Sequence, residues 1–250
     1  TLIAAGQRVA VLSVDPSAIQ GGGSILADKT RMSQLAAHPE AFIRPSPSRS
    51  SAGGIASSTA ETVQLCEAAG YQAVIVESVG VGQQAHDIRH VVDFLVLLVE
   101  PGAGDHLQGL KRGILEVVDC VAVNKADGSS IDLAEQTRAE YAAALAAFAG
   151  ANGPTVLTLS ALGKHGLDAV WQLVQDQRTR LQQDGELLQR RGEQRAAVFW
   201  QLLREQLVSQ FVSQPAVARR KEELLEQLQG NATTPRAAVQ ELLGLLVDKK

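Results

Sequence analysis

Five short runs of Val, Leu and Ile recur along the chain, separated by segments of helical length. The runs are apolar on both faces, as expected for strands of a parallel sheet that helices cover on both sides. They comprise residues 9–14, 73–78, 94–100, 120–125 and 155–160. Predicted helices at residues 58–70 and 130–150 alternate with them. This alternation predicts an α/β fold with a doubly wound, mostly parallel sheet that binds ligands at the carboxyl ends of its strands.

The composition narrows the functions open to the chain. A net charge of −4 and a pI near 5.8 provide no basic block for a nucleic acid or an anionic membrane, so we expect neither partner. No apolar run approaches the roughly 20 residues of a membrane span. Cys66 and Cys120 lie far apart without CxxC spacing, which fits a reducing compartment. We therefore expect a cytoplasmic protein, or a protein of the mitochondrial matrix if the source is eukaryotic.

Beyond about residue 181, helices alone replace the alternation of strands and helices. Residues 186–214 form one long predicted helix with an apolar stripe, which ends at Pro215. The C-terminal helices carry more apolar surface than a lone arm can cover. Self-association explains this surface, and packing against the sheet of the same chain is the alternative. The sequence thus predicts two parts, residues 1–180 and residues 181–250.

The first ten residues look like the end of an amphipathic helix that runs into the first strand. A sheet without the preceding strand and helix would leave a central edge unpaired, so we expect the chain to be N-terminally incomplete. The Gly-rich residues 22–32 do not supply a phosphate-binding loop. Asp28 stands where the pattern G-x-x-x-x-G-K-[ST] requires glycine, and its carboxylate would repel phosphates.

A guanine-binding motif follows the fourth predicted strand, where residues 124–127 read N-K-A-D. Asp127 can accept hydrogen bonds from N1–H and the 2-amino group of guanine, and adenine offers neither donor in that arrangement. Asn124 would bridge loops and contact the base, and the stem of Lys125 would lie over the base plane. One strand later, residues 160–162 read S-A-L, where a backbone N–H can contact the guanine carbonyl. The predicted base-binding residues are Asn124, Lys125, Asp127, Ser160, Ala161 and Leu162.

The segment VIVESVGVGQ, residues 74–83, provides candidates for the phosphate end of the site. An apolar strand that ends in an acid, with glycine three residues later, fits an acid near Mg²⁺ and an N–H that meets the γ-phosphate. Glu77 and Gly80 take these roles; the alternative is a strand followed by an ordinary glycine turn. Asp15 and Asp28 add two carboxylates. Because Mg²⁺ keeps several waters, we expect the three acids to act largely through its water shell.

Several long strings of the sequence together resemble the MeaB/ArgK/MMAA-type P-loop GTPases, chaperones of adenosylcobalamin-dependent methylmalonyl-CoA mutase. The resemblance runs in order along essentially the whole chain. The strings that carry it are VLSVDPSAIQGGGSILADKTRM, AFIRPSPSRSSAGGIA, LCEAAGYQAVIVESVGVGQ, GDHLQGLKRGILEVVD and VNKADG.

The resemblance implies roles for several positions of this chain. It implies a SIMIBI-like GTPase domain at residues 1–180, lacking its Walker A strand and loop, and a helical dimerisation arm at residues 181–250. Lys111 matches a functionally implicated lysine of a third switch that senses the mutase. The other implied positions are Asp15 and Asp28 near Mg²⁺, switch I around Asp28, switch II at Glu77 to Gln83, and the third switch at Gly104 to Gly113.

The function implied is a GTPase that binds GTP or GDP with Mg²⁺ and gates cobalamin loading or protection of an acyl-CoA mutase. Catalysis would involve Asp28, Glu77, Gly80 and Lys111, and we expect the chain without a Walker A motif to hydrolyse GTP poorly. One alternative is a related GTPase that inserts nickel, although the five histidines are scattered. A dimeric scaffold that hydrolyses nothing is the other.

Overall fold

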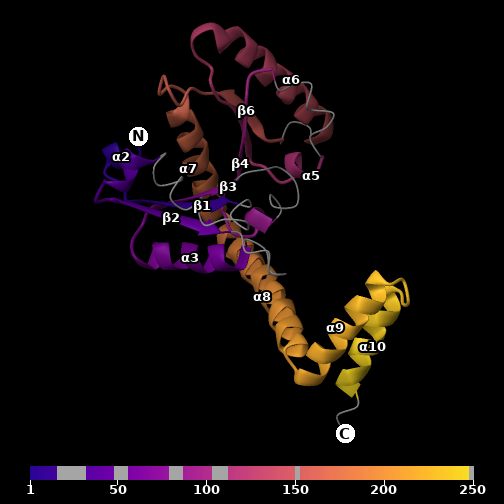
Figure 1. Ribbon diagram of the computed structural model, residues 1–250. Helices are drawn as coiled ribbons and strands as arrows, with labels where there is room; N and C mark the ends of the chain where they lie inside the picture. The colour runs from indigo at the N-terminus through magenta and orange to yellow at the C-terminus, as the bar shows by residue number, and fades with distance from the viewer. Residues whose placement is uncertain (16–31, 48–55, 79–86, 103–111, 150–152, 248–250) are drawn as a thin grey trace. The chain divides into compact units, whose positions relative to one another are not determined.

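The computed structural model of the protein describes six stretches of the chain (Figure 1). These are residues 1–15, 32–47, 56–78, 87–102, 112–149 and 153–247. They fall into two compact units, Thr1–Val198 and Phe199–Lys250, so that the boundary lies within one long helix. The predicted division at residue 180 into a GTPase domain and a dimerisation arm stays a prediction.

The described residues of the first unit form two three-stranded sheets, and every strand pair in these sheets is parallel. The first sheet has the order β2-β1-β3, formed by Ala41–Pro47, Val9–Asp15 and Ala73–Ser78. The second has the order β4-β5-β6, formed by Val96–Val99, Cys120–Val123 and Thr155–Thr158. Five of these six strands coincide with the apolar runs of the sequence.

Strand β2 is absent from the sequence-based expectation because it contains Pro45 and Pro47. An inner strand uses its N–H groups in hydrogen bonds to the strands on both sides. Proline has no N–H group, so its presence argues against a central strand. The structure places β2 at the edge of its sheet, where it pairs with β1 alone among the described strands. Ile43 of this strand is buried and supplies the apolar contact that the pairing needs.

Helices cover both faces of the first sheet through the alternating side chains of β1. Val9 and Val11 face the 3₁₀ helix Ile3–Ala5, helix α2 (Ser33–Ala36) and Trp171 of helix α7. Ala10 and Leu12 lie on the opposite face, where they pack against helix α3 (Ala56–Ala68). Because the strand is apolar on both sides, it fits only between two layers of helices.

The second sheet has its own apolar core. Side chains of β4 and β5 pack there against helix α6 (Ile131–Ala149), whose Tyr141 is fully buried, and against the short helix α5 (Arg112–Leu115). Helix α7 (Leu167–Gln183) follows β6. Because β5 and β6 pair in parallel, with Val123 opposite Thr158, the carboxyl ends of these two strands lie side by side.

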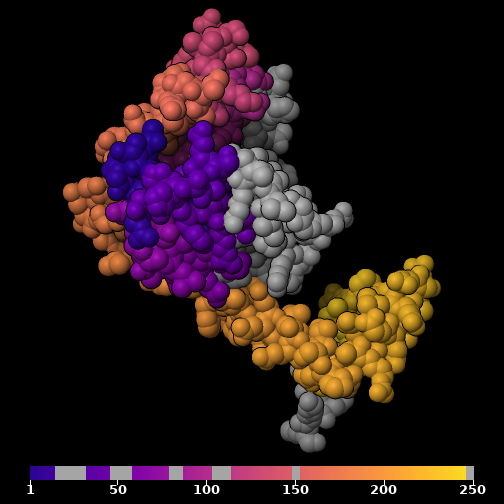
Figure 2. All heavy atoms as spheres, turned by 60° about the vertical axis from the view of Figure 1, so that its left-hand side comes forward, coloured from indigo at the N-terminus to yellow at the C-terminus, as the bar shows by residue number. Residues whose placement is uncertain are grey.

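The second unit consists of the C-terminal part of helix α8 (Glu186–Val212) and a helical hairpin. The hairpin helices, α9 (Pro215–Gln229) and α10 (Pro235–Val247), bury Val217, Leu224 and Ala238. Their atoms form one packed yellow body in the space-filling view (Figure 2). The side-chain oxygen of Thr234 accepts the N–H of Ala237 at 3.3 Å, so Thr234 begins α10 as an N-cap followed by proline.

No helix among the described residues is long and apolar enough to cross a membrane.

Candidate functional site

The N-K-A-D segment begins where β5 leaves the second sheet, and main-chain bonds fix it on both sides. The N–H of Asn124 donates to the carbonyl of Val99 at 2.9 Å, and the N–H of Ala126 donates to the carbonyl of Leu159 at 3.0 Å. Between these bonds the backbone of Lys125 adopts a φ of 60°, a left-handed conformation that is uncommon for a residue with a side chain. Such local strain persists where the surrounding contacts over-determine the backbone.

Asp127 is held by the loop that follows β6. The hydroxyl of the fully buried Ser160 donates to Oδ2 of Asp127, and it accepts the N–H of Gly163 at 2.7 Å. Oδ1 of Asp127 has no hydrogen bond to any part of the chain that the structure describes. The carboxylate is therefore oriented through one oxygen, and the other is open to a donor.

Asn124 also bridges to the same loop, because its Oδ1 accepts the N–H of Ala161 at 3.2 Å. The structure thus brings Asn124, Asp127, Ser160 and Ala161 together, as the guanine motif requires. Leu162 is 86% exposed, so its side chain does not pack against the other residues of this site. Bridging and base contact by Asn124 are compatible, since its amide nitrogen is separate from the oxygen used here.

A tight turn that the sequence reasoning did not single out supports the S-A-L segment. The N–H of Ser160 donates to the carbonyl of His165 at 3.0 Å. Gly166 then has a φ of 75°, and a Cβ at that position would lie 2.5 Å from the carbonyl oxygen of Thr158. The signal available in the sequence is the pair Gly163 and Gly166, which encloses Lys164 and His165 a few residues after the strand.

Lys125 has an ionic partner that the sequence reasoning also missed. Its ammonium Nζ lies 2.5 Å from Oε1 of Glu100, the residue that follows the last residue of β4. The only sequence signal is an acid at the end of a strand, and pairing over 25 positions is visible only in three dimensions.

The phosphate end of the predicted site is described only in part. Glu77 lies on β3 at the level of Ser13 on β1, and Asp15 is the last residue of β1. Their backbones therefore reach the carboxyl end of the first sheet on neighbouring strands, and the side chain of Asp15 lies outside the described part of the chain. Asp28, Gly80 and Lys111 also lie outside the described residues. Within the described stretches, no group of three or more His, Cys, Asp or Glu side chains is placed to hold a metal.

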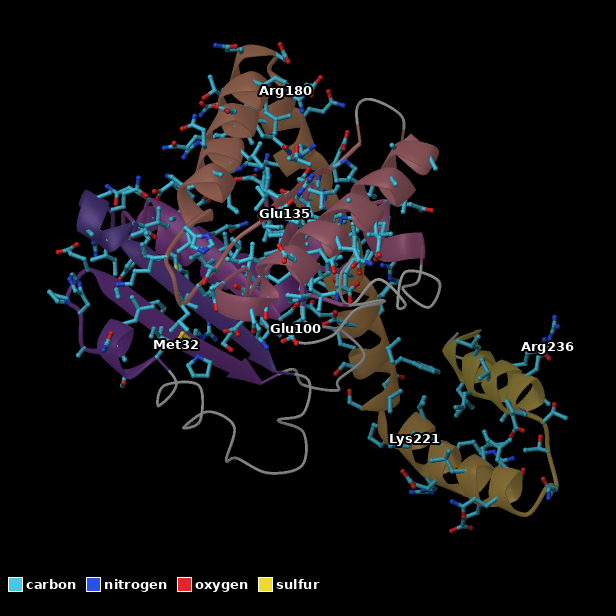
Figure 3. The ribbon with its side chains drawn as sticks, turned by 90° about the horizontal axis from the view of Figure 1, so that it is seen from above. Met32, Glu100, Glu135, Arg180, Lys221 and Arg236 are labelled. Carbon is cyan, nitrogen blue, oxygen red and sulfur yellow. The ribbon has the colours of Figure 1, made fainter. Side chains whose placement is uncertain are left out.

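A cavity of about 750 Å³ in the first unit lies away from these residues. Its lining includes Phe94, Asp119 and Thr155, which stand at the amino ends of β4, β5 and β6. In Figure 3, Arg180 of this lining and Glu100 are labelled on opposite sides of the first unit. Since ligands of open α/β sheets bind at the carboxyl ends of the strands, this cavity is not the nucleotide site.

The parallel sheets and the guanine motif at their carboxyl ends define a GTPase of the P-loop class. Residues 1–216 match the family described as methylmalonyl Co-A mutase-associated GTPase MeaB. The chain therefore belongs to the MeaB family. This confirms the family resemblance, the fold class and the GTPase class predicted from the sequence.

Relatives from bacteria and animals agree with this assignment. A protein of Mycobacterium tuberculosis named as a probable GTPase is 43% identical over 97% of this chain and 73% of its own length. The GTPase ArgK of Escherichia coli is 39% identical over 96% of this chain and 74% of its own length. The mouse mitochondrial methylmalonic aciduria type A homolog is 38% identical over 93% of this chain and 57% of its own length.

Two solved structures share the fold. The crystal structure of an LAO/AO transport system kinase has a TM-score of 0.69 and 32% identity, covering 98% of this chain and 74% of that one. HypB from Helicobacter pylori, solved with nickel, has a TM-score of 0.50 and 16% identity, covering 70% of this chain and 77% of that one. At that identity the likeness to HypB extends to the fold alone.

Proposed function

We propose that the protein binds GTP at the N-K-A-D segment, hydrolyses it with Mg²⁺, and uses its nucleotide state to gate cobalamin loading or protection of methylmalonyl-CoA mutase. The observation that carries the proposal is the carboxylate of Asp127, held through Oδ2 by the buried hydroxyl of Ser160. A carboxylate with one oriented and one open oxygen suits the two donors of guanine. An adenine base would leave it without partners, at a cost of about 1–3 kcal/mol.

Nucleotide titration of the full-length protein tests the base assignment. Asp127→Asn exchanges one acceptor oxygen for an amide donor, so the preference should move from GTP toward xanthosine triphosphate. Asp132→Asn, on the first turn of α6, is the matched control and should leave the preference unchanged. Unchanged GTP affinity in Asp127→Asn would contradict the assignment. Absence of GTP binding by the wild type would favour the scaffold alternative.

Mg²⁺ would supply charge neutralisation at the phosphates and hold their oxygens. Two of the residues proposed to hold Mg²⁺ support this role by their position. Glu77 and Asp15 occur near the carboxyl ends of the paired strands β3 and β1. Glu77 is half-buried and would hold the ion largely through water, because Mg²⁺ keeps most of its hydration shell. Chelation of Mg²⁺ should therefore lower GTP affinity, and Glu77→Gln should raise the Mg²⁺ concentration needed for half-maximal turnover.

The mutase partner is inferred from the family description, and Lys111 remains the candidate residue for stimulation by that partner. A cation that reaches the γ-phosphate only when a partner is bound would accelerate hydrolysis. Lys111→Ala should then lower the GTP turnover stimulated by methylmalonyl-CoA mutase by a larger factor than it lowers basal turnover. Lys221→Ala, in the second unit, serves as the control. Full stimulation in Lys111→Ala would rule out this role.

Self-association through the C-terminal helices is the remaining part of the proposal. Helix α8 has no buried residue in its described length, and Phe199, Trp200, Leu207 and Val208 are all more than half exposed. Apolar surface of this kind on a helix is typical of an interface. The occupant proposed for it is a second copy of the same chain.

A further inference from the structure

We infer that Glu100 is a positioning residue of the guanine site, which acts by fixing the side chain of Lys125. The inference rests on the proposed function, because Lys125 belongs to the N-K-A-D segment. Neither the family motif nor the sequence reasoning assigns a role to Glu100.

The two residues stand at the exits of neighbouring strands. The carbonyl of Val99, the last residue of β4, accepts the N–H of Asn124 at 2.9 Å. Glu100 follows Val99, and Lys125 follows Asn124. Oε1 of Glu100 lies 2.5 Å from Nζ of Lys125. Figure 3 labels Glu100 beside the ribbon of α6, and Gly102 donates its N–H to Thr137 of that helix at 2.9 Å. The base of the Glu100 side chain is therefore anchored to the same strands and helix as the guanine motif.

The backbone of Lys125 is already fixed, so the ion pair acts on the side chain. Main-chain hydrogen bonds of Asn124 and Ala126 hold the strained backbone of Lys125 between them. A lysine side chain loses rotational entropy when it is ordered. A carboxylate that restrains the ammonium before the nucleotide arrives removes part of this cost from binding.

Exposure of the pair determines how large the effect is and how it responds to salt. The side chains of Lys125 and Glu100 are 61% and 69% exposed. Exposed ion pairs are worth about 0.2–1 kcal/mol, which corresponds to about a 1.4- to 5-fold change in a dissociation constant. Such pairs are screened when the Debye length falls to a few ångströms. A salt-dependent change in GDP affinity is therefore the signature of this role.

The experiment titrates GDP into full-length Glu100→Gln at low and high salt. At about 20 mM salt the Kd should rise about 1.4- to 5-fold, and at about 1 M salt the difference from the wild type should vanish. Glu100→Asp, which keeps the charge, should restore part of the affinity. The matched control is Glu40→Gln, which removes the acid of the exposed Arg8–Glu40 pair and should change nothing.

A second substitution shows whether Glu100 acts through Lys125. Lys125→Met keeps an apolar stem and removes the ammonium, so Glu100→Gln should have no further effect in that background. An equal effect in both backgrounds, or no effect at low salt, would overturn the role of Glu100 and leave the guanine site standing. If the wild type binds no GDP, or Asp127→Asn binds it as well as the wild type, the proposed function and this role fail together.

Discussion

The hydroxyl of Ser160 donates a hydrogen bond to the carboxylate of Asp127 and thereby joins two loops that lie 33 positions apart. The same hydroxyl accepts the N–H of Gly163, so its proton is directed at the carboxylate. Ser160 is fully buried, so the donor end of the bond is shielded from water. Shielding strengthens a hydrogen bond to a charged group and makes its loss costly.

Ser160→Ala should weaken guanine nucleotide binding by about tenfold or more. The substitution removes a bond to a charged group worth about 1.5–3 kcal/mol and frees the carboxylate of Asp127 to rotate. Fluorescence titration with a labelled GDP measures the change. Ser129→Ala, an exposed serine of the adjoining turn, is the control and should bind as the wild type does. An affinity unaffected by Ser160→Ala would show that Asp127 needs no partner.

Gly166→Ala should destabilise the fold more than Gly6→Ala does. The two glycines have nearly the same φ, 75° and 78°, so alanine pays a similar conformational penalty of about 1–2 kcal/mol at both. Only at Gly166 would the new Cβ collide with main chain, 2.5 Å from the carbonyl oxygen of Thr158. Urea unfolding should show an additional loss of about 1 kcal/mol or more. Equal losses of unfolding free energy at the two sites would mean that the turn after β6 moves to accommodate the new Cβ at little cost.

Local sequence patterns were sufficient to predict most of the architecture. A strand such as β5 is recognised because it is apolar on both faces and fully buried, and its pattern needs no partner to be read. Strand β2 is not predicted from the sequence because its prolines are compatible only with an edge strand. Whether a strand lies at the edge depends on the whole sheet and not on local sequence. Strand order likewise depends on pairings between distant segments.

The same distinction holds for the site. Asn124 and Asp127 were found because their function requires a fixed spacing along the chain, and Ser160 because it follows the next strand. Glu100 was missed because its contact with Lys125 depends on the spatial neighbourhood of two strand exits. The supporting turn around Gly166 was missed for a similar reason, since its close approach to Thr158 arises only on folding.

Arg191→Met should lower the unfolding free energy by about 1 kcal/mol at low salt, with a smaller effect at high salt. The guanidinium of Arg191 binds the carboxylate of Asp93 at 3.0 and 2.5 Å and Glu67 at 2.9 Å, and these bonds raise the pKa of Arg191. Methionine keeps much of the apolar stem and removes the charge. Arg195→Met, on an exposed face of the same helix, is the control. A salt-independent loss would indicate that packing, and not the ion pairs, is responsible.

Stability should fall as the pH rises above about 9, in part through Cys120. Burial, and then the charge of Asp119, raises the pKa of the Cys120 thiol from 9.0 to about 11. Between these values the unfolded chain releases the thiol proton and the native chain keeps it, so the unfolded state gains up to about 1.4 kcal/mol per pH unit. Urea unfolding of Cys120→Ala across this range should show a shallower pH slope than the wild type. Identical slopes would show that Cys120 does not contribute.

The self-association proposed for helix α8 predicts that Leu207→Glu is more monomeric than the wild type. Leu207 is 57% exposed on a stretch of α8 where Val208 is 54% exposed, and burial of a leucine contributes about 1.5–3 kcal/mol. A charged side chain in its place would lose that contribution and remain unpaired in the interface, so the dimer dissociation constant should rise at least about tenfold. Sedimentation velocity over a range of concentrations measures this dissociation constant.

Gln206→Glu introduces the same charge at the neighbouring exposed position and should leave the dimer intact if the apolar stripe forms the contact. A monomeric wild type, or a Leu207→Glu variant that dimerises normally, would remove α8 from the interface.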